Sequence, residues 1–97
     1  MPKGYAVYLL ASQRNGTLYI GSTSNLIQRI HQHKASQADG FTKQYRVDQL
    51  VWFEMHESSL AMVTRERQLK EWKRQWKVEL IEKENPLWRD LYAELLG

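Results

Sequence analysis

The sequence contains no cysteine, which excludes disulfide bonds, zinc sites built on thiolates and a cysteine nucleophile. It also lacks any apolar run close to the roughly 18 residues of a membrane-spanning helix. The first ten residues, MPKGYAVYLL, have no cleavage region of the kind that ends a signal peptide. These absences predict a cytoplasmic protein with no membrane partner.

The composition that is present is ordinary for a folded protein. The 97 residues are 42% hydrophobic and 26% charged, a balance that favours a globular domain over a disordered chain. A chain of this length can bury one hydrophobic core but is too short for two domains. We therefore expect a single domain over residues 1–97.

The net charge of +3 is distributed unevenly. Residues 1–77 contain 12 lysines and arginines against 6 acidic residues, whereas residues 78–97 contain 2 against 5, so the two parts carry +6 and −3. The basic part is suited to binding a polyanion, although a charged stretch such as 65–77 can also be a solvated helix face. The predicted nucleic-acid contacts are Lys34, Lys43, Arg46, Lys70 and Lys73.

The N-terminal third predicts a β-hairpin followed by a helix. Alternation in YAVYLLA, residues 5–11, is followed by Asn15-Gly16, a pair suited to tight hairpin turns, and by the strand TLYIG, residues 17–21. The Ser-Thr-Ser-Asn run that comes next offers several helix N-caps. Apolar residues at helical spacing then predict a helix that ends near Lys34.

The rest of the chain predicts one further strand and more helices. We expect a polar loop over residues 35–48 and then a strand over residues 50–55, which is apolar on both faces. Three helical stretches follow: one capped by Ser58 or Ser59 with a break near 75–77, a second to about Glu84, and a last one opened by Pro86 through 87–95. This order predicts the α/β class in its α+β form, with a small three-stranded antiparallel sheet flanked by helices.

Strand geometry places two tyrosines on the same face of the predicted hairpin. Side chains alternate along a strand, so the numbering puts Tyr8 and Tyr19 on the same face of the hairpin. A strict two-residue turn at Asn15-Gly16 would leave them staggered by several residues. Close approach of their rings therefore requires a longer or bulged connection.

Three further polar residues lie beside apolar positions of helices. At about 100° per residue, Arg29 and His33 are only about 40° apart and lie beside the apolar stripe of the first helix. We therefore expect both to border the core instead of pointing freely into water. Glu66 follows Met62 by four residues and precedes Leu69 by three, which places a carboxylate on the apolar face of the long helix.

Each of these residues also has a purely structural interpretation. Tyrosines on a half-buried strand are commonly core residues, and an arginine or histidine beside an apolar stripe commonly lies over it or bonds to backbone. A lone carboxylate commonly pairs with a neighbouring base. Asn85, which precedes a proline, is most simply a helix cap.

In combination, however, these residues resemble the GIY-YIG nucleases. Residues 6–8, AVY, are similar to the first motif of the family, with alanine and valine in place of its glycine and isoleucine, and residues 19–21, YIG, match the second. The resemblance covers nearly the whole chain and is especially clear for the small single-domain bacterial members. It continues at four positions: Arg29, His33, Glu66 and Asn85.

The resemblance implies a metal-dependent endonuclease that hydrolyses phosphodiester bonds in DNA. Glu66 would be the single protein ligand of Mg²⁺ or Mn²⁺, which would stabilise the leaving oxygen. Arg29 would bind the phosphate with its planar guanidinium. Asn85 would fix the geometry of the metal site, or would simply cap its helix.

The resemblance also implies an unusual general base. Tyr8 or Tyr19 would take a proton from water while the other tyrosine orients it. His33 would accept or relay the phenolic proton, since histidine titrates closest to neutrality. The sequence does not choose between the two tyrosines.

Substrate targeting remains open at this point. Larger family members include homing endonucleases, restriction enzymes and the incision subunit of bacterial excision repair, which gain targeting from added domains. A free-standing module in DNA repair or recombination would need a protein partner or a second copy, recognise a DNA structure, or cut with little specificity. The alternative from another class is a noncatalytic nucleic-acid-binding module with the same fold.

Overall fold

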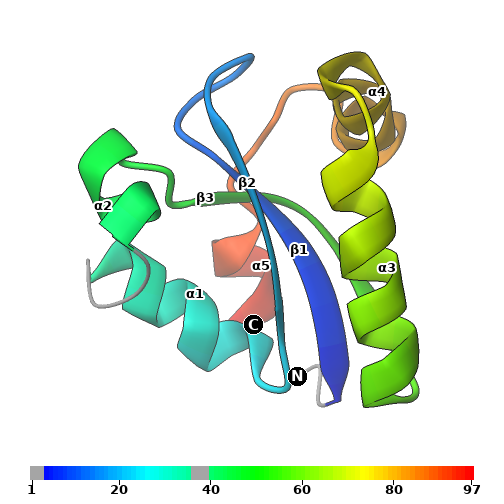
Figure 1. Cartoon of the computed structure of the whole chain (residues 1–97). Helices are drawn as coiled ribbons and strands as arrows, with labels where there is room; N and C mark the ends of the chain where they lie inside the picture. The colour runs from blue at the N-terminus through cyan, green and yellow to red at the C-terminus, as the bar shows by residue number, and fades with distance from the viewer. Residues whose placement is uncertain (1–3, 36–39) are drawn as a thin grey trace.

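The computed structural model describes residues 4–35 and 40–97 and contains one antiparallel three-stranded sheet (Figure 1). The strands are β1 (Tyr5–Ala11), β2 (Leu18–Thr23) and β3 (Gln49–His56), in the order β2-β1-β3. β1 is therefore the central strand and β2 is an edge strand. The predicted fold class, a small antiparallel sheet flanked by helices, is confirmed.

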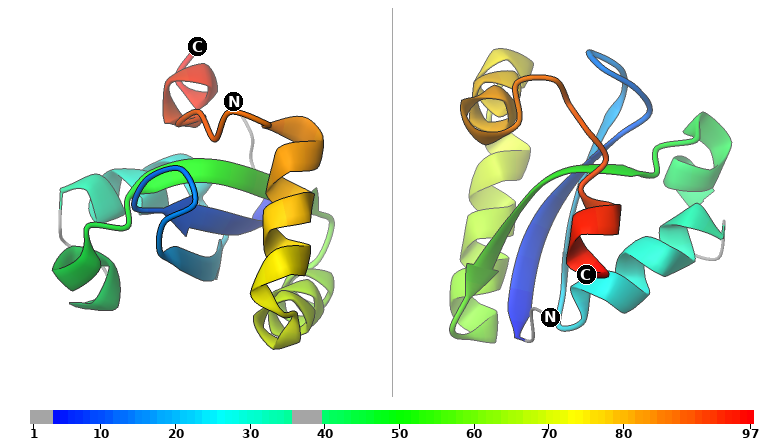
Figure 2. Two further views of the ribbon diagram at one scale, coloured as in Figure 1. Left: turned by 90° about the horizontal axis from the view of Figure 1, so that it is seen from above. Right: turned by 180° about the vertical axis from the view of Figure 1, so that it is seen from behind.

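Helices cover both faces of this sheet. They are α1 (Leu26–Lys34), α2 (Gly40–Tyr45), α3 (Ser59–Glu71), α4 (Arg74–Glu84) and α5 (Tyr92–Leu95). α1 and α5 lie side by side on one face, and α3 and α4 lie on the other (Figure 1, Figure 2). None of the helices in the described part of the chain has both the length and the apolar character of a membrane span.

The side chains of β1 alternate between two cores, so this strand is apolar at almost every position. The α3-side core consists of Val7, Leu9, Ala11, Ile20, Val51, Trp52, Met62, Leu69, Ile81 and Trp88. The α1-side core consists of Ala6, Tyr8, Leu10, Leu26, Ile30, Val47 and Leu50. Each layer of helices thus packs on its own core, and β1 contributes residues to both cores.

The connection between β1 and β2 determines how the two tyrosines meet. The strands pair Tyr8 with Gly21 and Leu10 with Tyr19, so the two tyrosines lie on one face with ring centroids 6.5 Å apart. The connection runs from residue 12 to residue 17, and Asn15 within it adopts a positive φ of 60°. The expectation of a longer connection than a two-residue turn is confirmed.

The side chain of Tyr8 requires a glycine at position 21, whereas the backbone conformation of Gly21 does not. A Cβ atom at Gly21 would overlap Oη and Cζ of Tyr8 and would lie 3.0 Å from its Cε1. The phenol ring therefore lies directly against the backbone of β2. This close approach is possible because glycine has no side chain.

Asn85 ties the end of α4 to β3. Its side chain is buried, and Nδ2 donates to the carbonyl oxygens of Val51 at 3.1 Å and Arg89 at 2.9 Å. Oδ1 accepts from the backbone N–H of Arg89 at 3.0 Å. Asn85 therefore caps the C-terminus of α4, whereas the sequence predicted a cap at the start of a following helix.

Two boundaries in the middle of the chain differ from the prediction. Residues 40–45 form α2 inside the segment predicted as a polar loop, because the buried Thr42 is within hydrogen-bond distance of His33, a residue of another helix. The break between the long helices lies at Trp72 and Lys73 and not at 75–77. Trp72 takes an extended backbone conformation there and packs against the α3-side core.

The final helix is shorter than predicted. The segment 86–91 lies outside any helix, and α5 starts only at Tyr92. Trp88 adopts a φ of 56°, is buried in the α3-side core and donates from Nε1 to Glu82 at 2.7 Å. Burial of the indole therefore overrides the helix that Pro86 would open.

Gly21→Ala should destabilise the protein, because the added Cβ displaces the buried phenol of Tyr8. Overpacking of this kind lowers the free energy of unfolding by about 1–3 kcal/mol. Gly40→Ala is the matched control, since a Cβ at Gly40 meets no atom within 4 Å. Urea unfolding measures the difference, and equal stability of the two variants would contradict the packing of Tyr8 on Gly21.

Asn85→Ala should lower the free energy of unfolding by at least about 2 kcal/mol, because each buried backbone group left unpaired costs roughly 1–3 kcal/mol. Glu84→Ala, at the exposed neighbouring position, should change it by less than about 0.5 kcal/mol. Thermal unfolding of both variants is the measurement. A fully stable Asn85→Ala protein would show that the residue is retained for some purpose other than this turn.

Candidate active site

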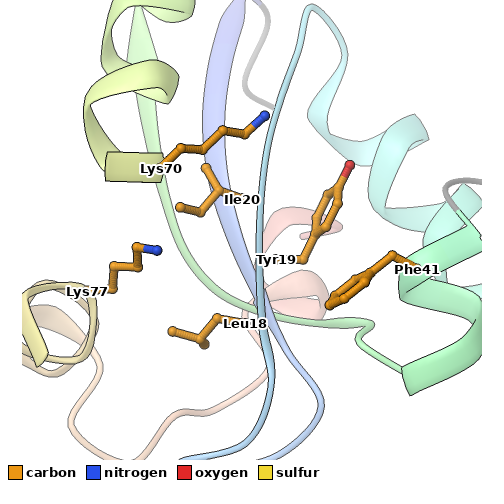
Figure 3. Close-up of a pocket in the computed structure, with 6 residues that line it drawn as sticks. All are labelled: Leu18, Tyr19, Ile20, Phe41, Lys70 and Lys77. Carbon is orange, nitrogen blue, oxygen red and sulfur yellow. The ribbon is translucent and has the colours of Figure 1, made fainter. Parts of the chain in front are cut away.

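A pocket of about 390 Å³ lies over the edge strand β2. It is lined by Leu18, Tyr19, Ile20, Phe41, Lys70 and Lys77 (Figure 3). Tyr19 and Phe41 lie on one side of β2, and Lys70 and Lys77 lie on the other. Because β2 is at the edge of the sheet, the pocket is open to residues from both faces.

A buried cluster packs against Tyr19, on the side of β2 where Phe41 also lies. Oη of Tyr8 lies 3.0 Å from Nε2 of His33, and Nδ1 of His33 lies 3.0 Å from Oγ1 of Thr42. All three side chains are buried. A neutral imidazole donates through one nitrogen and accepts through the other, so His33 couples the hydroxyl of β1 to the hydroxyl of α2.

Tyr19 is the tyrosine that faces the pocket. Its ring packs against His33, with centroids 5.5 Å apart, and stacks on Phe41, with centroids 6.2 Å apart and an angle of 28° between the planes. Tyr19 is half-buried, whereas Tyr8 is only 2% exposed. The predicted pair of tyrosines is therefore brought together, and one member is accessible to a ligand.

Glu66, in α3, is the ion-pair partner of Lys70, which lines the pocket. Oγ of Ser22 donates to Oε1 at 2.5 Å, and Nζ of Lys70 lies 2.9 Å from Oε2. Burial alone would raise the pKa of Glu66, but the hydrogen bonds from Ser22 and Lys70 and the charges of Lys70 and Arg67 outweigh it and lower the pKa. The carboxylate is thus held ionised and oriented.

The surroundings of Glu66 fit a divalent cation. The ammonium of Lys70 already occupies a cation position beside Oε2, and its side chain is 56% exposed, so it can move away. Among the residues that the structure describes, no three acidic or histidine side chains gather at one point. Glu66 would hold an ion as a single carboxylate, and Mg²⁺ accepts this arrangement when water and phosphate oxygens complete its shell.

Arg29 lies on α1, one turn before His33. Its side chain is exposed, so the expectation that it would border the core is wrong, while His33 is buried as expected. Helical spacing places Arg29 next to the stripe but does not determine how deep it lies. The guanidinium makes no hydrogen bond or ion pair within residues 4–35 and 40–97, and it is available to a phosphate.

Other predicted residues are used elsewhere in the fold. The amide of Asn85 is bonded to backbone at the end of α4, and Nζ of Lys34 pairs with Asp90 at 2.5 Å and lies over the ring of Tyr92. Lys73 lies over Trp76, 4.8 Å from the ring centroid. Two more of the residues predicted to contact nucleic acid are exposed: Lys43 within α2 and Arg46 directly after it.

Four residues of the site were missed by the sequence analysis: Ser22, Phe41, Thr42 and Lys77. Phe41 and Thr42 fall in the segment predicted as a loop. The four-residue spacing of Phe41 and Tyr45 was the available signal, because aromatic residues at this spacing share one side of a helix. Ser22 and Lys77 carried no local signal, since their roles depend on contacts between distant segments.

Comparison with known proteins identifies the family of the chain. The family model of the GIY-YIG catalytic domain matches residues 4–79, a range that includes every candidate residue of the pocket and excludes Asn85. No solved structure matches.

Three relatives are similar over most of the chain, and each is called a UPF0213 protein. The one from Staphylococcus haemolyticus is 38% identical and covers 84% of this chain and 98% of its own. The one from Syntrophus aciditrophicus is 37% identical, and the match covers 89% of this chain and 97% of the relative. The one from Pediococcus pentosaceus is 35% identical, and the match covers 82% of this chain and 83% of the relative. The chain therefore belongs to the GIY-YIG family, whose catalytic domain is that of endonucleases that act on DNA and generally use divalent metals.

Proposed function

We propose that the protein is a metal-dependent endonuclease that hydrolyses phosphodiester bonds of DNA in the pocket over β2. The observation that carries the proposal is the two-sided lining of this pocket: Tyr19 on one wall and Lys70, the partner of Glu66, on the other. A phosphate over the edge of β2 would meet a phenol on one side and a cation held by a carboxylate on the other. Membership of the GIY-YIG family supports nuclease chemistry independently.

We assign the role of general base to Tyr19. It lines the pocket, whereas the hydroxyl of Tyr8 is buried and within hydrogen-bond distance of His33. Tyr19 would take a proton from water while the water oxygen bonds to phosphorus and the bond to the leaving alkoxide breaks. Positive charge near a phenol favours its ionised form, and Lys70 and Lys77 line the same pocket.

The buried cluster would position this base. Tyr8 and His33 pack against the ring of Tyr19 at centroid distances of 6.5 and 5.5 Å, and Thr42 holds the far nitrogen of the imidazole. His33 can share the phenolic proton of Tyr8 across their 3.0 Å contact. These three residues therefore act through Tyr19.

Two charged residues would act on the phosphate. Arg29 presents a planar fork of donors that remains charged throughout and suits phosphate oxygens. Glu66 would hold Mg²⁺ or Mn²⁺ with one oxygen fixed by Ser22, after Lys70 moves aside. When bound, the ion would supply charge stabilisation for the leaving oxygen. Of the two roles predicted for Asn85, its bonds to backbone support the structural one.

The second candidate function is noncatalytic binding of nucleic acid. It is favoured by the ion pair of Lys70 with Glu66, which would neutralise the carboxylate permanently if no metal displaces the lysine. Incubating the protein with branched, nicked, single-stranded and duplex DNA, in Mg²⁺, Mn²⁺ or EDTA, separates the two functions. Cleavage that EDTA abolishes supports the endonuclease, and binding without cleavage on every substrate would replace it with the binding module.

Glu66→Gln should abolish metal-dependent cleavage, because glutamine keeps the volume but loses the anionic ligand. Glu71→Gln, at an exposed position of the same helix, should cut like the parent protein. The measurement is the cleavage rate in Mg²⁺ and in Mn²⁺. Cutting by Glu66→Gln at the parent rate would exclude Glu66 as the metal ligand.

The same variant has a stability signature that does not depend on cleavage. Because folding lowers the pKa of Glu66 from 4.5, its ionisation stabilises the fold above that pH, and the contribution is lost as the pH falls through the folded-state pKa. Glu66→Gln should therefore unfold at a lower temperature than the parent near neutral pH, and the gap should close in acid. Circular dichroism melts across this range provide the check.

Arg29→Ala should reduce cleavage by at least about 10²-fold, the usual effect of losing one donor to a transition-state charge, while DNA affinity changes much less. Arg29→Lys keeps the charge but not the fork, so it should recover binding more than turnover. Arg14→Ala, an exposed position in the β1–β2 connection, is the control. The measurement compares the single-turnover cleavage rate with the DNA affinity in Ca²⁺. If the rate and the affinity decline by the same factor, Arg29 only binds the phosphate and does not stabilise the transition state.

A further inference from the structure

A row of aromatic rings leads from the pocket to the surface of α2. Phe41 stacks on Tyr19 and lies 4.8 Å from Tyr45, centroid to centroid. Phe41 is 42% exposed and Tyr45 is 50% exposed. We call Tyr19, Phe41 and Tyr45 the aromatic row; its inner ring lines the pocket and its outer two rings reach solvent.

The outer two rings of the row lie outside the two cores of the sheet. Tyr19 packs against the α1-side core, but Phe41 and Tyr45 belong to neither core. α2 is anchored through the buried Thr42, and its two aromatic residues lie one turn apart on the surface. Adjacent exposed rings beside a pocket are typical of a binding surface, whereas single exposed apolar residues are common everywhere.

Cationic residues are present in and directly after α2 and in the pocket. Lys43 and Arg46 are exposed at and directly after α2, and Lys70 and Lys77 line the pocket at the inner end. The sequence of α2, GFTKQY, contains no acidic residue. Aromatic faces between cations bind unpaired nucleic-acid strands, because bases stack on the rings while the cations attract the phosphates.

We propose that the aromatic row is a subsite for unpaired nucleobases, which guides an unpaired portion of a DNA strand toward the pocket. A base inside a duplex is stacked between its neighbours, so it cannot lie on Phe41 or Tyr45 unless it is first unpaired. The inference rests on the proposed function, since a base stacked on the row would bring a neighbouring phosphate to Tyr19. The subsite would add to the proposed endonuclease a preference for DNA substrates that contain unpaired bases.

The test is equilibrium binding of fluorescent oligothymidylate in EDTA, where no cleavage occurs. Phe41→Ala and Tyr45→Ala should each weaken binding by about 5- to 100-fold, the range for losing one base–aromatic stack. The slope of log affinity against log salt should stay at the parent value, because no phosphate contact is lost. An abasic strand of the same length should bind parent and variants alike, and Phe41→Trp should bind oligothymidylate as well as the parent does.

Two controls separate the subsite from general damage. Leu60→Ala removes a side chain that is 75% exposed in the first turn of α3, away from the row, and should leave binding unchanged. Phe41→Leu keeps apolar volume and removes the ring, so it should lose affinity even if the alanine variant is poorly folded. Thermal melts of each variant verify the fold.

Three results would overturn the inference. First, the alanine variants could lose as much affinity for the abasic strand as for oligothymidylate. Second, the parent could bind a duplex of the same length as tightly as the single strand. Third, the parent could sediment as a dimer that Phe41→Ala dissociates. The last result would make the row an interface between copies. Since the measurement is binding, a protein that stacks unpaired bases but never cuts DNA would refute the proposed function and leave the subsite in place.

Discussion

The contact between the phenol of Tyr8 and the backbone of Gly21 is the constraint on which the rest of the site depends. Without a Cβ at Gly21, the ring lies against β2 and its hydroxyl lies 3.0 Å from His33 on α1. His33 in turn lies 3.0 Å from Thr42 on α2. One line of buried contacts thus joins β1, β2, α1 and α2.

This line explains how α2 is held. A helix of six residues is far too short to be stable alone in water, and α2 contributes one buried residue, Thr42. The contact of Thr42 with the imidazole of His33 therefore helps to hold α2 in place. The stacking of Phe41 on Tyr19 follows from the same anchor, since the two rings meet only when α2 is docked.

An edge strand allows so small a protein to combine residues from both faces of its sheet. Alternation along β2 sends Tyr19 toward α1 and Ser22 toward α3, where Ser22 meets Glu66. On a central strand the sheet itself would separate such residues. At the edge, a single ligand lying over β2 would be within reach of both walls, so the proposed site draws on two layers of helices.

Periodicity predicted what depends on local geometry. The shared face of Tyr8 and Tyr19 followed from the alternation of strands. An N-cap was predicted at Ser58 or Ser59 from residue type, and Ser58 is the cap, with Oγ accepting from the N–H of Ala61. The depth of Arg29 and the helix around Thr42 could not be predicted, because both depend on what another segment places beside them. Resemblance to the GIY-YIG family indicated which residues are candidates for the site, while the packing of each one had to come from the structure.

The open edge of β2 has a consequence for how this chain behaves among other copies of itself. An unpaired strand edge is a template on which another chain can extend the sheet, and charged side chains are a common defence against such pairing. Lys70 and Lys77 stand beside this edge, so the residues proposed to attract a nucleic acid also make the edge unfavourable for a second protein strand. A bound polyanion would neutralise these charges and would also cover the edge. The ligand, in place of the lysines, would then keep another chain from pairing with β2.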